Sequence, residues 1–435
     1  MTVQARRNAL LDRLPEGMRG HAALVGNAAS MMSTTLVTSL LGVAFWWVAA
    51  RYFSQTAVGV GSAAVSALTL LGFAGSLGMG TLLMGELPRR EGGRRSLLDA
   101  ALAVTTLTGA VAGLVFALLV PLFSSELESL GGSPASVLIF AAAVGLTSLG
   151  YVIDQSLIGM LRGKLQFARN CVFSAVKLVA LVPVAALVAD PGATWIYAVW
   201  GGGIAASLLV LVGFYREGRG EPLRPDFAAL GALRRHAASH HGFNLTLMAP
   251  SMVVPIVVVS MISADANANF YVAWMIAGFI SMVPVSLATV LYAVASADPS
   301  RLTEQLRLTF LISFGVGVAA NLFLAVAAGP VLGVFGSEYA EQADVPLHIL
   351  ALGVFPLTVK TAYVALQRVR QRTAAALPVA IVGTLLEVGG AVLGASLTGD
   401  LAGVSWGWLA GVCLEVLLMG RPVWAALRVS GRGGP

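Results

Sequence analysis

The chain has 435 residues, of which 57% are hydrophobic and only 11% are charged, and its formal net charge is +6. Soluble domains carry roughly 25% charged residues, so this composition excludes a chain that covers its whole surface with water-facing side chains. It predicts a protein whose solvent is lipid.

Residues 1–23 come first in the chain and contain several arginines but no short apolar core followed by a cleavage site. We therefore expect a cytoplasmic N-terminal arm rather than a signal peptide. Twelve apolar runs follow, each long enough to cross a bilayer as a helix, which takes about 17–25 residues. Barrel strands are about half that length and alternate in polarity, so an all-α protein is predicted. The runs cover residues 24–50, 57–84, 97–122, 135–161, 170–188, 195–214, 243–262, 270–294, 307–329, 345–366, 374–397 and 401–420.

The distribution of Lys and Arg predicts the orientation, because cytoplasmic loops carry the excess of positive charge. With the N-terminus inside, Arg51 is the one cation of 27 that falls in an outside loop, while Lys177 and Lys360 lie within spans. The same count supports an even number of spans, since one missing span would invert every later loop. Both termini are therefore expected to be cytoplasmic.

The longest inside loop, residues 215–242, separates six spans from six. We predict an N-lobe over 24–214, a C-lobe over 243–420 and a cytoplasmic tail over 421–435. Weak internal matches suggest a parallel repeat: one alignment of the halves places Asn27 over Asn244, and a slightly shorter offset further on places Asp154 over Lys360. Such repeats are a transporter architecture, with the site at the repeat interface.

Several ionisable residues lie inside the predicted spans, and five of them are candidates for a functional site. Asp154, Lys177, Lys360 and Glu415 form a layer in the inner half of the membrane, and Glu387 lies deeper. Each would cost at least a few kcal/mol if it faced lipid, so these side chains should face one another or a watery cavity. In one interpretation they form buried pairs that only lock helices together. In the other they line a pathway that binds an anionic substrate or exchanges protons.

The first and seventh spans each carry a polar stripe at helical spacing, so its members share one face. Such stripes either pack helices together or line a cavity, and the repeat favours a cavity shared by the first helix of each half. The stripes consist of Asn27, Ser30, Thr34 and Thr38 in the first span and of Asn244, Met248, Ser251 and Pro255 in the seventh.

Other candidate motifs are weaker. His236, His240 and His241 have helical metal spacing but no Cys or acidic partner, and the surrounding stretch is more simply an interfacial helix on anionic lipid. Cys171 and Cys413 are far apart in apolar segments, which favours packing over a disulfide. Neither a phosphate-binding loop nor a catalytic set occurs. We therefore predict no enzyme activity, no metal or other cofactor and no nucleic-acid partner.

Three stretches resemble a known group, the multidrug/oligosaccharidyl-lipid/polysaccharide (MOP) exporter superfamily. "AARYFSQTAVGVGSAAVS" (49–66) resembles its first outside turn and second helix, and "GPVLGVFGSEYAEQADVPLHILALG" (329–353) its ninth-to-tenth span junction. "VIDQSLIGMLRGKLQFARNCVFSAVKL" (152–178) resembles spans four to five of its polysaccharide branch. The resemblance implies a MATE-like fold of twelve helices in two lobes, with alternating access around a central cavity.

The polysaccharide branch flips undecaprenyl-pyrophosphate-linked oligosaccharides from the inner to the outer leaflet of the bacterial cytoplasmic membrane. On this resemblance Lys177 and Lys360 are expected, by position, to attract the pyrophosphate. The stripes, with Asn27, Thr34, Thr38, Asn244 and Ser251, would contact sugar. Asp154, Glu387 and Glu415 would balance charge or couple transport to H⁺ or Na⁺.

The partners expected on this resemblance are the lipid-linked oligosaccharide, membrane lipids and glycosyltransferases or polymerases of extracellular polysaccharide assembly. Two alternatives stay open. One is a cation-coupled exporter of drugs or small metabolites, and the other is a non-transporting membrane partner of a glycan-synthesis complex.

Overall fold

The computed structural model describes residues 37–90, 92–212 and 225–428, and this part of the chain is helical and contains no strand. Long apolar runs form helices because lipid offers no hydrogen-bond partners to an open backbone. Eleven helical segments in the described ranges are long and apolar enough to cross a membrane, so the chain is a multi-pass membrane protein. The first predicted span, 24–50, lies partly outside the described residues, and its described part is helical over 37–52. The count of twelve therefore stays a prediction.

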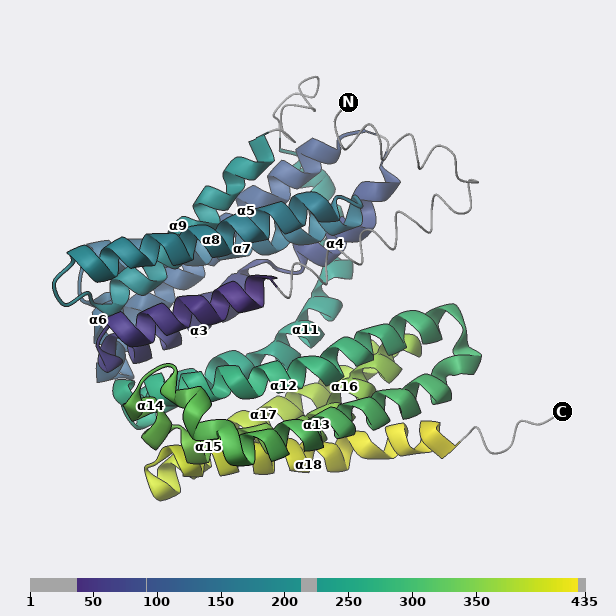
Figure 1. The fold of residues 1–435 in the computed structure, drawn as a ribbon. Coiled ribbons are helices and arrows are strands. Elements are labelled where there is room, and N and C mark those ends of the chain that lie inside the picture. The colour runs from purple at the N-terminus through teal and green to yellow at the C-terminus, as the bar shows by residue number, and fades with distance from the viewer. Residues whose placement is uncertain (1–36, 91, 213–224, 429–435) are drawn as a thin grey trace, which may run out of the picture.

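The helices form two bundles, shown in Figure 1. The N-lobe contains the helix over 37–52, α3 (Gln55–Gly75), α4 (Met79–Glu86), η1 (Leu87–Arg89), α5 (Arg94–Leu119), η2 (Val120–Leu122), η3 (Ser125–Leu127), α6 (Glu128–Gly131), α7 (Pro134–Gly159), α8 (Gly163–Leu187), α9 (Ala193–Ser207) and η4 (Leu208–Leu211). The C-lobe contains α11 (Phe227–Met261), α12 (Ala264–Ala297), η5 (Pro299–Arg301), α13 (Leu302–Gly333), α14 (Ser337–Gln342), α15 (Asp344–Leu352), α16 (Val354–Val369), α17 (Thr373–Thr398) and α18 (Leu401–Arg428).

Helix α11 connects the two lobes. Its N-cap Asp226 accepts a hydrogen bond from the Ala229 N–H at 2.9 Å, and the Asp226 N–H donates to the Ser96 carbonyl of the N-lobe at 3.1 Å. The helix then continues without a break into the C-lobe, where it packs against α17. Residues 227–242, which the sequence pattern placed in the inter-lobe loop, thus form its first turns.

The helix ends reveal the register of the internal repeat. Leu161 and Gln371, both non-glycine residues with positive φ (56° and 55°), end equivalent hairpin turns. Ser54 and Ser263 both cap a helix through their side chains. The number of residues between these two serines is nearly the same as between Leu161 and Gln371, so both pairs give nearly the same alignment of the two halves. The two offsets expected from the sequence are therefore wrong, because isolated residue matches do not define a register and helix ends do. In the observed register, Lys360 corresponds to Gly150, one turn away from Asp154.

The two lobes contact closely at the end where α3 and α12 begin. Asn267 is buried and donates hydrogen bonds to the Gly59 carbonyl at 2.8 Å and to Ser62 Oγ at 3.0 Å. Thr56 Oγ1 donates to Asp265 Oδ1 at 2.6 Å. Figure 1 shows the bundles closest together near α6 and α14 and diverging towards the opposite end. We call these contacts the outer latch, because the Lys and Arg distribution predicts that this end faces outside.

Candidate functional site

The main ionic cluster of the C-lobe joins three helices within the membrane-spanning region. Lys360 on α16 forms a salt bridge with Glu387 on α17, and its Nζ lies 3.1 Å from Glu415 Oε2 on α18. All three side chains are buried, and Glu415 has no exposed surface. The sequence predicted these three as intramembrane charges, and the structure brings them together. We call them the C-lobe triad.

The two carboxylates of the C-lobe triad have different environments. Glu387 contacts Lys360 and also accepts a hydrogen bond from Trp408 Nε1 at 3.0 Å. Neither oxygen of Glu415 accepts a hydrogen bond of good geometry from any described residue. A side chain at Gly383 would collide with Glu415, since a Cβ there would lie 2.0 Å from its Oε1. The glycine thus makes room for a second buried carboxylate beside one ammonium group.

A cavity of about 370 Å³ lies in the C-lobe beside the triad. Its walls come mainly from α11, α12 and α16, and α17 and α18 each contribute one residue. Trp274 and Trp408 form one end, with ring centroids 5.0 Å apart in an edge-to-face arrangement. Ser251, a predicted site residue, also lines the cavity, and its carbonyl accepts a hydrogen bond from Trp274 Nε1 at 3.2 Å.

Arg368 lines the same cavity two helical turns from Lys360. Its Nη2 donates to Asn244 Oδ1 on α11 at 2.9 Å, so the predicted residue Asn244 holds this guanidinium in place. The sequence pattern counted Arg368 only as one of several cytoplasmic cations. A cluster of arginines after a span is the usual topology signal, and nothing in it marks the one that turns inward.

Lys177 of α8 is a buried cation of the N-lobe, with 3% of its surface exposed. Its ammonium lies over the rings of Trp200 (3.6 Å to the centroid), Phe173 (4.5 Å) and Phe45 (5.3 Å). Among the described residues it forms no salt bridge. Cation–π attraction is strongest when the cation is desolvated, so these rings stabilise the charge without neutralising it.

The repeat relates this lysine to the C-lobe triad. In the register of the hairpin turns, Lys177 corresponds to Glu387, and each contacts a tryptophan of the last helix of its lobe, Trp200 or Trp408. Gly203 of α9 and Gly411 of α18 let that helix approach, because a Cβ on them would lie within about 3 Å of the neighbouring helix. Equivalent positions thus carry opposite charges in the two lobes.

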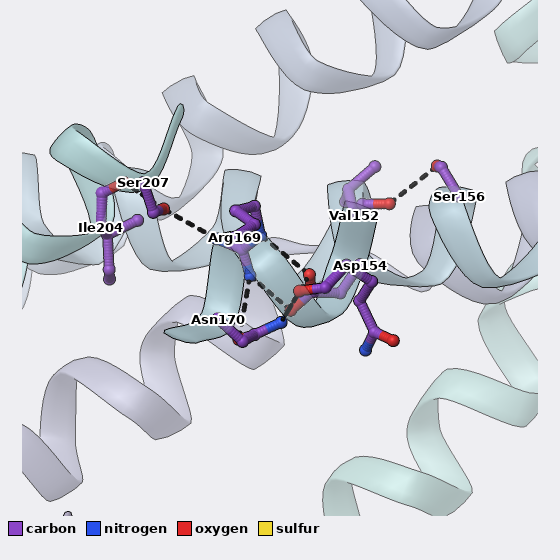
Figure 2. A network of polar contacts seen from close by, with 8 residues as sticks. Val152, Asp154, Ser156, Arg169, Asn170, Ile204 and Ser207 are labelled. Carbon is purple, nitrogen blue, oxygen red and sulfur yellow. Dashed lines mark hydrogen bonds and ion pairs between the residues drawn. The ribbon is translucent and has the colours of Figure 1, made fainter. Parts of the chain in front are cut away.

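Asp154 belongs to a separate network in the N-lobe, drawn in Figure 2. Arg169 of α8 donates from Nε to Asp154 Oδ1 at 2.9 Å and from Nη2 to Oδ2, a bidentate pair. Asn170 Nδ2 also donates to Asp154 Oδ1 at 3.1 Å, and Arg169 Nη1 donates to Ser207 Oγ at the end of α9 at 3.2 Å. The network joins α7, α8 and α9. In this structure Asp154 pairs with Arg169 and not with Lys177 or Lys360, whose charges the sequence pattern predicted it would balance. Arg169, which the sequence pattern assigned to a cytoplasmic loop, lies buried inside α8.

The remaining predicted site residues are spread along the chain. Asn27 and Thr34 lie outside the described residues, and Thr38 lies in the helix over 37–52. His241 stacks on Phe73 with ring centroids 5.0 Å apart, so one member of the histidine group packs against α3. In the described part of the chain, no three His, Cys, Asp or Glu side chains are placed to hold a metal ion.

Comparison with known proteins places the fold. No family model matches the chain, and no curated protein sequence matches it. A multidrug resistance MATE-family transporter of the MOP superfamily, solved in an inward-facing conformation, is similar with a TM-score of 0.67 and 16% identity, over 91% of this chain and 95% of that one. An outward-facing structure of such a transporter gives a TM-score of 0.59 at 16% identity, over 94% and 96% of the two chains.

A third similar structure is a MOP superfamily transporter from Pyrococcus furiosus, described as having a binding pocket of reverse polarity. Its TM-score is 0.61 at 16% identity, over 94% of this chain and 96% of that one. The structural neighbours are thus transporters rather than enzymes, and they cover nearly the whole chain. The chain shares the fold of these transporters, as the resemblance in sequence implied. These neighbours do not specifically support the polysaccharide branch that residues 152–178 resemble.

Proposed function

We propose that the protein is a membrane exporter that works by alternating access of its two lobes and is coupled to a cation at the C-lobe triad. The observation that carries the proposal is the excess carboxylate of the triad: two buried acids share one ammonium group. A net negative charge at this depth is expensive. A bound H⁺ or Na⁺ would neutralise this charge. Glu387 and Lys360 line the cavity, so the bound cation would lie next to the space in which a substrate binds.

The outer latch supports the alternating-access part of the proposal. Gly59 approaches the Ala264 carbonyl so closely that a Cβ on Gly59 would lie 1.7 Å from the oxygen. Contacts this close must separate if the outer end opens. The higher TM-score with an inward-facing neighbour, 0.67 against 0.59 for an outward-facing one, agrees with a closed outer end.

Within the triad, Glu415 is the better candidate for the cation-binding carboxylate. Glu387 has a second donor in Trp408, which stabilises its ionised form, whereas Lys360 is the one described cation within salt-bridge distance of Glu415. A proton or Na⁺ on Glu415 would weaken its ion pair with Lys360, and Lys360 would then pair with Glu387 alone. The three helices that carry the triad could then change their packing between the two states.

Glu415→Gln is therefore expected to lower the rate of gradient-dependent transport at least about tenfold, while the protein still folds. The amide mimics the protonated acid and cannot exchange a proton. The measurement is efflux from proteoliposomes with and without an imposed H⁺ or Na⁺ gradient. The probes are ethidium, a lipophilic cation, and a dansyl-labelled decyl phosphate, a lipophilic anion. Glu304→Gln, at an exposed glutamate of α13, is the matched control. Unchanged gradient dependence in Glu415→Gln would exclude this role.

The second candidate function is flipping of a lipid-linked oligosaccharide, with H⁺, Na⁺ or the membrane potential as the driving force. The specific observation in its favour is that Arg368 lines the cavity and forms no salt bridge with a described carboxylate, so its charge is available for a pyrophosphate. Lys177, the other cation without a described carboxylate partner, is buried beneath aromatic rings and would have to be uncovered first. Glycosyltransferases or polymerases would then be its partners in the cytoplasmic membrane.

Deleting the gene in the source organism distinguishes the two candidates. The flippase predicts that lipid-linked sugars accumulate on the inner leaflet while surface polysaccharide is lost. The exporter of drugs or metabolites predicts normal polysaccharide and altered sensitivity to amphipathic compounds. If the protein is instead a non-transporting partner of a glycan-synthesis complex, the deletion strain also loses polysaccharide. In that case every triad substitution that impairs function should also impair folding.

A further inference from the structure

The hairpin between α16 and α17 carries three arginines, and the structure separates them. Arg370 and Arg372 are exposed, as expected for residues at a membrane surface. Arg368 is only partly exposed and lines the C-lobe cavity. A charged side chain that turns away from the aqueous surface towards an apolar cavity loses hydration, and such a residue inside a membrane protein marks a functional site by default.

The guanidinium of Arg368 is held in position without being neutralised. It donates a hydrogen bond to the amide oxygen of Asn244 at 2.9 Å, and among the described residues it forms no salt bridge with a carboxylate. A guanidinium has five N–H donors in a planar fork that fits a carboxylate or phosphate. Most of these donors, and the full positive charge, therefore remain available on the cavity side.

The cavity has charged residues at two depths, Arg368 at one end and Lys360 with Glu387 deeper, and most of its remaining lining is apolar. Arg368 and Lys360 are two turns apart on α16, about 12 Å along the helix axis. On α16, Thr361, Val364 and Ala365 line the cavity between them, and Leu357 lines it beyond Lys360. Trp408 packs against Gly353 at the start of α16 and contacts Trp274, so the two tryptophans lie at the end away from Arg368. The volume of about 370 Å³ fits a molecule of drug or lipid-headgroup size rather than an ion alone.

The site occurs in one lobe only. In the register of the hairpin turns, Arg368 corresponds to Ile158 of α7. The repeat therefore does not explain the arginine as a structural feature that both lobes need. The N-lobe forms the same hairpin with an apolar residue at this position.

We propose that Arg368 and Asn244 form an anion subsite that takes the phosphate or carboxylate group of an amphipathic cargo, whose apolar part lies along α12 and α16 towards Trp274 and Trp408. The proposal rests on the proposed transport function, because it names the class of molecule carried. It assigns the anionic group to the cytoplasmic end of the cavity and the cation of the coupling step to the deep end.

The test measures binding to the purified full-length protein in a neutral detergent. The probe is the dansyl-labelled decyl phosphate, followed by energy transfer from the protein's tryptophans, beside the same chain ending in an alcohol. Arg368→Gln is expected to weaken binding of the phosphate probe at least about tenfold and to leave the alcohol probe nearly unchanged, because a charge-assisted fork is lost. Arg370→Gln, on the same hairpin but exposed, is the matched control and should bind both probes like the parent.

Equal binding of the phosphate probe by the parent and Arg368→Gln would overturn the proposal, as would an equal loss in Arg370→Gln, which would indicate surface charge alone. Arg368→Lys keeps the charge and should bind with intermediate affinity, which covers the case in which Arg368→Gln fails to fold. An anionic phospholipid added to the micelles identifies the source of the anion. If the phospholipid competes with the probe, the natural anion is a lipid headgroup. If it does not compete, the natural anion belongs to a soluble amphiphile, and either result supports the subsite. Failure here would leave the gradient dependence tested at Glu415 unaffected.

Discussion

Replacing Lys360 with Met is expected to destabilise the protein by about 3–5 kcal/mol, the usual cost of breaking a buried ion pair from one side. Lys360 is the only described cation within salt-bridge distance of Glu387 and Glu415. Without it, two buried carboxylates lie next to each other with no countercharge among the described residues. The substitution itself adds little strain, because Met follows the lysine stem and fills nearly the same space.

Thermal unfolding in detergent, monitored by tryptophan fluorescence, measures this effect. Lys177→Met is the matched control, because it removes an equally buried lysine without leaving a described carboxylate unpaired. We expect it to stay within about 1 kcal/mol of the parent, since the lost cation–π attraction is offset by relief of a buried charge. The triple variant Lys360→Met, Glu387→Gln and Glu415→Gln should recover most of the lost stability. If both lysine substitutions lower the stability equally, the ion pairs of the triad are not the source of the stability that Lys360 provides.

Gly59→Ala is expected to open the outer latch. A Cβ at Gly59 would lie 1.7 Å from the Ala264 carbonyl oxygen, and backbone atoms on both sides leave no flexible side chain that could move away. The closest approach of α3 to α12 is then lost, and with it the hydrogen bond from Asn267 to the Gly59 carbonyl. We expect the population with a closed outer end to fall at least about tenfold, equivalent to about 1.4 kcal/mol.

Cross-linking of cysteines placed at Thr56 and Asp265, whose side chains are 2.6 Å apart, reports closure of the outer latch. Cys171 and Cys413 are replaced by Ser beforehand so that they do not react. The cross-link should form rapidly in the parent background and slowly with Gly59→Ala. Gly202→Ala, at an N-lobe glycine with open space around it, should leave the rate unchanged. Rapid cross-linking in the Gly59→Ala background would mean that the lobes close without this contact.

Hydropathy and charge patterning were sufficient for the part of this protein that depends on lipid as a solvent. Long apolar runs must be helical in a bilayer, and eleven of the predicted spans appear as membrane-length helices. Likewise, a charge within a span must find a partner or a cavity. Lys360, Glu387 and Glu415 do so on three different helices, and Lys177 does so beneath aromatic rings.

The partners themselves depended on tertiary structure. Sequence spacing gives the depth of a residue in the membrane, but the rotation of its helix and its neighbours come from packing. Asp154 was therefore placed at a reasonable depth while its partner, Arg169, was assigned to a loop, because a cation just inside a helix end looks the same in sequence as one just outside it.

The same limit applies to Arg368, which lies in the last turn of α16 and lines the cavity, whereas Arg370 at the C-cap is exposed. It applies also to the repeat, whose register became clear from the hairpin turns at Leu161 and Gln371. The sequence by itself determined that the chain spans the membrane in two lobes and carries charges within it. Which charges meet, and which one faces the cavity, was decided by helix packing, since the order of residues along a helix gives their depth but not the rotation of the helix or its neighbours.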